Sequence, residues 1–187
     1  MTALFISLGI LAILILWTIS KYNLLVKLRN NRENAFADID VQLKQRHDLI
    51  PQLVSTVKGY ASHEKETLDM VVTARSAAIN ARSIDEKIVA ENALTSALAG
   101  LKVTVEAYPD LKANTNFLQL QEEVSDIENK LAAVRRFFNS ATKELNTAVE
   151  MFPSNIVAGM FGFRREMMFD LGTSERKNLE QAPQINF

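Results

Sequence analysis

The sequence predicts an all-α protein, in which an N-terminal transmembrane helix continues into an antiparallel up-down-up-down four-helix bundle. The 187 residues include only 6 Gly and 4 Pro, which is too little turn chemistry for many strands. Apolar side chains recur three and four positions apart along most of the chain, and this is the spacing of one helix face. Residues 1–20 carry no charged side chain, which indicates a membrane span.

The predicted anchor is residues 1–20, MTALFISLGILAILILWTIS. A helix of this length spans about 30 Å, the thickness of one hydrocarbon core. Trp17 and Tyr22 lie where interfacial aromatic residues belong. No basic segment precedes the apolar run and no small-residue cleavage site follows it, so we expect a retained single-pass anchor rather than a cleaved signal peptide.

The charges that flank the anchor predict its orientation. Only the terminal amine precedes the span, whereas four cationic side chains follow it: Lys21, Lys27, Arg29 and Arg32. The positive-inside rule then places the N-terminus outside and the body of the protein in the cytoplasm.

Residues 21–152 are predicted to form the bundle. The first helix ends near Ile50, because Pro51 cannot donate a hydrogen bond to the preceding turn, and a second helix starts near Leu49 to Gln52. In the alternative, Pro51 is a kink inside one very long helix, and a three-helix body results.

Two further helices complete the predicted bundle. Ser83-Ile84-Asp85-Glu86 fits a capping box and opens the third helix, which Tyr108-Pro109-Asp110 closes. The fourth helix has an apolar seam of the coiled-coil type, with apolar residues three and four apart from Phe117 to Ala148. If the helices alternate in direction, the chain after Phe152 returns to the membrane.

The two histidines, His47 and His63, raise the question of a metal or catalytic site. His63-Glu64-x-x-Thr67 begins like the zinc-protease motif H-E-x-x-H, but a threonine stands in place of the second histidine. The chain has no cysteine and no glycine-rich phosphate loop. We therefore expect no catalytic, cofactor or metal site. The alternative is an unrecognised metal-dependent or hydrolytic enzyme that uses His47 and His63.

The sequence favours a structural role for these polar residues. His47 falls on the inward stripe of its helix, and Glu64 and Arg75 occupy seam positions of the next one. Buried polar groups in a bundle must be paired, and their pairing fixes register. We expect a buried polar seam that includes pairs among His47, Asp48, Glu64 and Arg75. A formal net charge of −1 gives no reason to expect a nucleic-acid partner.

Residues 153–187 are predicted to form a C-terminal apolar segment and a polar tail. FPSNIVAGMFGF is almost continuously apolar, and two arginines follow it. The segment is either a flap folded onto the end of the bundle or an interface with lipid, a partner or a second copy. The candidate interface residues are Ile156, Val157, Met160, Phe161, Phe163, Arg164 and Arg165.

Four stretches of the chain resemble the LemA family: residues 22–64, AYPDLKAN, ENKLAAVRRFFN and FPSNIVAGMFGF. The resemblance covers roughly residues 20 to 165. The chain departs from the family pattern at Phe36, where tryptophan is usual, at Gln52, where asparagine is common, and at Gln45, where arginine often appears. The resemblance has further implications. It implies a bacterial protein with an N-terminal anchor and a helical bundle, without established catalytic residues.

The family's association with HtpX-type membrane metalloproteases and envelope homeostasis implies an adaptor or scaffold at the inner membrane. The expected partners are therefore the lipid bilayer, further copies of the chain in a homo-oligomer, and a membrane protein such as an HtpX-type protease. A lipid-interface remodelling protein is a further alternative, in which the C-terminal segment inserts into the interface.

Overall fold

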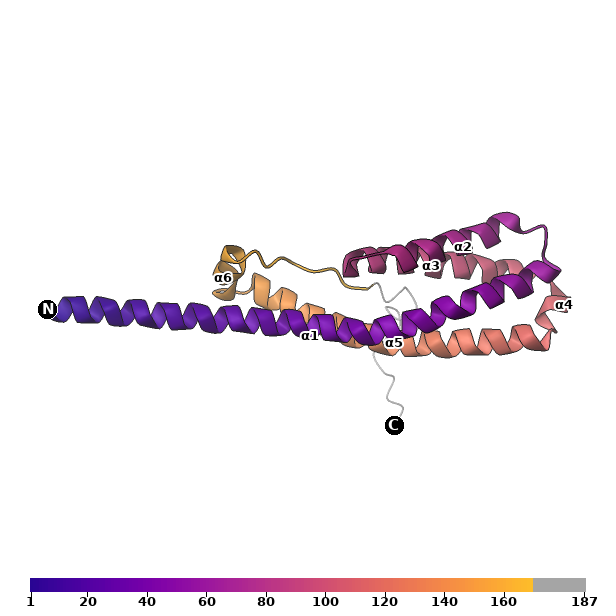
Figure 1. Ribbon diagram of the computed structural model, residues 1–187. Helices are drawn as coiled ribbons and strands as arrows, with labels where there is room; N and C mark the ends of the chain where they lie inside the picture. Colours follow the sequence, from indigo (N-terminus) through magenta and orange to yellow (C-terminus); the bar gives the residue numbers. More distant parts are fainter. Residues whose placement is uncertain (170–187) are drawn as a thin grey trace, which may run out of the picture. The chain divides into compact units, whose positions relative to one another are not determined.

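The computed structural model describes residues 1–169 and is drawn in Figure 1. These residues form helices and no strand, which confirms an all-helical fold for this part of the chain. The helices are α1 (Thr2–Tyr60), α2 (Lys65–Asn80), α3 (Ile84–Val105), α4 (Pro109–Lys112), α5 (Thr115–Glu150) and α6 (Ser154–Met160). The predicted polar tail lies outside the described residues.

The described chain divides into two compact units. Unit 1 consists of Met1–Phe36 and Phe137–Met168, and unit 2 consists of Ala37–Arg136 together with Phe169. Because α1 and α5 are long, each of them contributes residues to both units.

Pro51 does not end a helix: α1 passes through it without a break, so the predicted start of a new helix near this residue is wrong. The alternative, one very long helix with Pro51 inside it, is observed. A proline inside a helix lacks the N–H that would bond to the carbonyl four residues earlier, here the carbonyl of His47. Arg75 of α2 supplies another donor, because its Nε lies 2.7 Å from the His47 carbonyl oxygen.

The start of α3 is the capping box that the sequence predicts. The Ser83 hydroxyl accepts a hydrogen bond from the Glu86 amide at 3.1 Å. The Glu86 carboxylate accepts in return from the amides of Arg82, at 2.8 Å, and Ser83, at 3.3 Å. These backbone donors stabilise the charged carboxylate and lower the pKa of Glu86.

The long apolar seam corresponds to α5, which begins after a short separate turn, α4. Asn114 caps α5, since its side-chain oxygen accepts from the Phe117 amide at 2.9 Å. Along α5 the seam residues Phe117, Leu120, Ile127, Leu131, Phe138 and Leu145 are buried.

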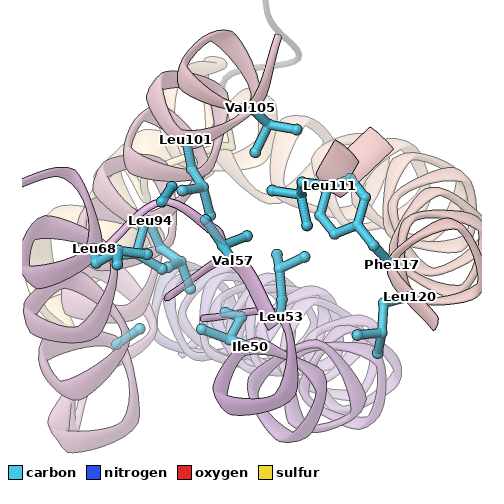
Figure 2. Close-up of a cluster of buried hydrophobic side chains, with 13 residues drawn as sticks. Ile50, Leu53, Val57, Leu68, Leu94, Leu101, Val105, Leu111, Phe117 and Leu120 are labelled. Atoms are coloured by element: carbon cyan, nitrogen blue, oxygen red, sulfur yellow. The ribbon is translucent and has the colours of Figure 1, made fainter. Parts of the chain in front are cut away.

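An apolar core in unit 2 includes residues from all of its helical segments, as Figure 2 shows. The labelled side chains are Ile50, Leu53 and Val57 from α1, Leu68 from α2, Leu94, Leu101 and Val105 from α3, Leu111 from α4, and Phe117 and Leu120 from α5.

Two helices in the described part of the chain are long and apolar enough to cross a membrane, α1 and α3. They differ in burial. The apolar stretch near the start of α1 has no buried residue, whereas α3 places Leu94, Leu101 and Val105 in the core of unit 2. We therefore interpret α3 as a core helix and the start of α1 as the candidate anchor.

Unit 1 contains a small apolar core. Leu25 of α1 packs with Val157 and Ala158 of α6. Phe36 and Phe138 meet edge to face, with ring centroids 5.5 Å apart. These contacts join the two chain segments that form unit 1.

Candidate functional site

His47 belongs to a buried cluster of charged side chains in unit 2. Its Nε2 lies 2.6 Å from Oε1 of Glu91 on α3. The other oxygen of Glu91 accepts a hydrogen bond from Nη1 of Arg46 at 3.1 Å. Arg46 and Glu91 each have a side chain that is only 1% exposed. One buried carboxylate is thus shared between a guanidinium and an imidazole.

A second carboxylate completes the cluster. Nη2 of Arg46 lies 2.7 Å from Oε1 of Glu128 on α5 and 3.0 Å from the Thr95 hydroxyl. Arg46 therefore bonds to α3 and α5 at once. Burying a guanidinium is costly unless it is paired, and here two carboxylates balance it. The cluster connects α1, α3 and α5 through side chains.

Both oxygens of Glu91 are occupied by neighbouring side chains, which suits structural pairing better than ligation of a metal ion. Within residues 1–169, no three His, Cys, Asp or Glu side chains are grouped so that they could hold a metal ion. His63 is exposed in the turn between α1 and α2, whereas His47 is largely buried. The two histidines thus have different surroundings.

The other residues of the predicted polar seam have three different placements. The Nε atom of half-buried Arg75 donates to the His47 carbonyl, as described above. Glu64 is half-buried and accepts from the Tyr108 hydroxyl at 2.9 Å. That hydrogen bond and the charge of Glu64 stabilise the protonated phenol and raise the pKa of Tyr108. Asp48 is exposed, so the prediction that it belongs to a buried polar seam is wrong for this residue.

Sequence reasoning missed the two most deeply buried members of the cluster, Arg46 and Glu91. A signal for both exists in the spacing. Arg46 stands three residues after Leu43 and four before Ile50, on the same stripe. Glu91 stands three residues after Ile88 on the stripe of α3. This signal is weak, because charged residues on an apolar stripe are rarely fully buried.

A cavity of about 460 Å³ lies beside the charged cluster. Arg46, Thr95 and Glu128 form its polar lining near the cluster, and apolar walls come from α3 and α5. The apolar lining includes Leu98, Leu101, Phe117 and Val124. This size falls in the range of small-molecule sites, and the lining suits an apolar group better than it suits acid–base chemistry.

The predicted C-terminal interface lies in unit 1 and is divided in two. Val157 is buried and Phe163 is half-buried, so these two residues belong to the core of the unit. The other predicted residues are exposed: Ile156, Met160, Phe161, Arg164 and Arg165.

Gly162 determines how the chain leaves α6. Its φ of 73° lies in the left-handed region, which glycine adopts at little cost. The next amide, that of Phe163, then bonds to the Ala158 carbonyl at 2.9 Å, and the Phe163 ring packs on the core of unit 1. The conformation of Gly162 therefore turns the chain back, so that Phe163 packs on the core of unit 1.

Two polar residues fix the segment that follows. The side chain of Asn146 makes a reciprocal pair with the backbone of Glu166: it accepts from the amide at 2.8 Å and donates to the carbonyl at 2.9 Å. Buried Arg32 lies 3.2 Å from the Glu166 carboxylate and donates to the Met167 carbonyl at 3.2 Å. Neither role has a signal in local sequence, because each bond joins segments distant in the chain.

Comparison with known proteins gives one family and several relatives. Residues 35–187 match the model of the LemA family. Protein LemA of Metamycoplasma hominis is 28% identical over 88% of this chain and 75% of that protein. Magnetosome protein MamQ of Magnetospirillum gryphiswaldense is 21% identical over 80% of this chain. Magnetosome protein MamQ 2 of Paramagnetospirillum magneticum is 20% identical over 80% of this chain. The matches span 64% of the length of each of these two MamQ proteins.

Proposed function

Because the chain belongs to the LemA family, we propose that it is a membrane-anchored helical scaffold or adaptor, which holds proteins together at the bacterial inner membrane. One observation carries this proposal. The apolar start of α1 has no buried residue, and the same helix continues without a break into the core of unit 2. A helix of this kind ties a folded body directly to a lipid bilayer.

The interior of unit 2 supports a binding role rather than a catalytic one. The buried charges of Arg46 and Glu91 pair with each other and with neighbouring side chains. Pairing of this kind fixes which helices lie together, and it leaves the imidazole of His47 engaged by a carboxylate. We propose that unit 2 is an antiparallel four-helix arrangement of α1, α2, α3 and α5, and that the protein is not an enzyme.

The proposal includes orientation and partners. On the basis of the cations that follow the span, we propose that the N-terminus lies outside and the body in the cytoplasm. The proposed partner is first of all another copy of the chain, so that the functional form is a homo-oligomer. By family resemblance, an HtpX-type membrane metalloprotease is a second partner.

Self-association is tested by extraction of the full chain in a mild detergent and measurement of the mass of the intact particle. We expect a discrete assembly of several copies whose mass is unchanged on dilution. A monomer at all concentrations, with no complex when the HtpX-type protease of the same bacterium is co-expressed, would contradict the scaffold proposal. Elemental analysis of the same sample tests the enzyme alternative, because stoichiometric zinc or iron would favour a metal site at His47 or His63.

Orientation has its own test, which the absence of cysteine makes simple. Single cysteines at position 2 and in place of Val103 are labelled in intact spheroplasts with a maleimide that does not cross membranes. We expect labelling at position 2 and protection at position 103 until the membrane is opened. The reverse pattern would invert the proposed topology.

A further inference from the structure

The helix α6 has two apolar faces, and only one of them is covered within unit 1. Val157 and Ala158 pack against Leu25 of α1. Ile156 and Met160 stand four residues apart, so they share another face of the helix, and both are exposed. An apolar helix face in water is unfavourable, which raises the question of what covers it.

The exposed face belongs to a larger apolar surface around α6. Phe152 is 77% exposed and Met160 is 69% exposed. Met151 and Phe161 are exposed as well. We name the segment from residue 151 to residue 161 the foot. Apart from Asn155, its exposed side chains are aromatic, aliphatic or thioether, the residue types that enter a membrane interface.

The position of the foot along α1 indicates what surrounds it. The ring of Phe161 lies 4.7 Å from that of Tyr22, measured between centroids. Trp17 and Phe163 pack on the same small core as Leu25. The contacts with α1 therefore extend from Trp17 to Leu25, which is about 12 Å of helix axis at 1.5 Å per residue.

This part of α1 is where the uncharged span ends and Lys21 provides the first cationic side chain. Figure 1 shows α6 beside α1, beyond the end of α5 on the side of the N-terminus. If the span lies in lipid, the foot stands at the boundary between acyl chains and headgroups.

Charged residues flank the foot in a way that suits this boundary. Arg164 and Arg165 follow it after Gly162 and Phe163, and both arginines are exposed. Arg165 also bonds to Glu150, at the end of α5, at 3.0 Å. On α1, the guanidinium of Arg29 lies 5.5 Å from the centre of the Phe163 ring. Apolar side chains with cations beside them favour an interface with phospholipid headgroups.

We propose that the foot is a second membrane contact, in which Phe152, Ile156 and Met160 insert into the lipid interface next to the exit of the anchor. The inference rests on the proposed anchor and adds a lipid-binding surface to it. The covered face of α6 holds the helix against α1, while the uncovered face binds lipid. Unit 1 is thereby fastened to the bilayer at two places, the anchor and the foot.

The test uses the cysteine-free full chain in vesicles of phosphatidylcholine and phosphatidylglycerol. Single cysteines in place of Phe152 or Met160 carry a bimane fluorophore, and spin-labelled lipids or aqueous iodide serve as quenchers. The matched control is Val103→Cys, at a side chain that is 75% exposed on α3 in unit 2. Leu11→Cys reports on the anchor itself. Because the substituted foot and control side chains are exposed, each variant should keep the unfolding temperature of the parent chain.

We expect spin-labelled lipid to quench positions 152 and 160 several-fold more strongly than position 103, and iodide to quench them several-fold less. Quenching by iodide alone at 152 and 160 would overturn the proposal, since the foot would then be in water. Protection from both quenchers would also overturn it, because a protein surface would then cover the foot. If spin-labelled lipid does not quench position 11, the proposal of an anchor is wrong, and the proposal for the foot, which rests on it, is wrong too. If lipid quenches position 11 but not positions 152 and 160, only the proposal for the foot is wrong.

Discussion

The substitution Arg75→Met tests whether a side chain replaces the hydrogen bond that Pro51 cannot make. In the structure, Nε of Arg75 lies 2.7 Å from the His47 carbonyl oxygen, which has no donor four residues later. Methionine keeps much of the length of the side chain but removes the donor. A hydrogen bond from a charged group is worth about 1.5–3 kcal/mol. Because Arg75 is only half-buried, we expect a loss near the lower limit, about 1.5 kcal/mol.

A chain of this length loses about 2–4 °C in Tm for each kcal/mol. Arg75→Met should therefore lower the Tm of the full chain by about 3–6 °C. The assay is thermal unfolding in a mild detergent, monitored by the circular dichroism signal at 222 nm. Arg82→Met, just beyond the end of α2, is the control for the loss of a cationic side chain, and we expect it to change Tm by much less.

The decisive step is a double-mutant cycle with Pro51→Ala. Alanine restores the backbone N–H at position 51, and this N–H can bond to the His47 carbonyl as in an ordinary helix. Arg75→Met should then cost less than half as much as in the parent chain, which gives a coupling free energy of about 1 kcal/mol. If Arg75→Met costs the same with proline and with alanine at position 51, Arg75 does not substitute for the missing donor and the reasoning fails.

Three further predictions concern other contacts of unit 2. Glu91→Gln removes the more deeply buried of the two carboxylate charges that balance Arg46, and it should cost about 3 kcal/mol in denaturant unfolding. A loss below about 1 kcal/mol would contradict the importance of the pair. Ser83→Ala should cost about 1 kcal/mol through loss of the capping box, and an unchanged stability would show that the cap contributes nothing. Glu64→Gln should lower the raised pKa of Tyr108 toward its ordinary value of 10.0, measured as a difference in phenolate absorbance between the two proteins during titration. Because that pKa is raised in the folded state, Tyr108 contributes stability below about pH 10, and this contribution is lost as the pH rises through the folded pKa. Glu64→Gln should reduce this loss of stability at alkaline pH.

Much of the helical framework could be predicted from local sequence. The capping box at Ser83 was predicted and is present, because both of its partners lie within four residues. The seam from Phe117 onward was predicted as one helix, since its apolar side chains repeat at helical spacing over a long run. The stretches that resemble the LemA family indicate the family from sequence, and the family model confirms it.

The candidate site was predicted only in part. His47 was expected to be paired, and the structure places it on the carboxylate of Glu91, 44 positions away in the chain. Glu91 itself was missed, although it interrupts an apolar stripe. Pairing of buried charges depends on which helix faces are in contact, and the sequence of one helix does not contain that information.

The C-terminal segment shows the same limit. Its composition predicted either a folded flap or an exposed interface, and the structure divides the residues between both descriptions. Val157 faces the core of unit 1, whereas Met160, three residues later, is exposed. Helix periodicity allowed such a division, but the position of α6 against Leu25 determined which residues are on each side.

By itself, the sequence determined that this protein is helical, that its N-terminal residues are apolar enough to cross a bilayer, and where α3 begins. These properties depend on side chains that are neighbours along the chain. Only the tertiary structure decided that α1 continues through Pro51, because the donor that satisfies the His47 carbonyl comes from a residue 28 positions further along the chain. Propensity and periodicity are local quantities, whereas the satisfaction of a buried carbonyl or a buried charge depends on partners that only the fold brings close.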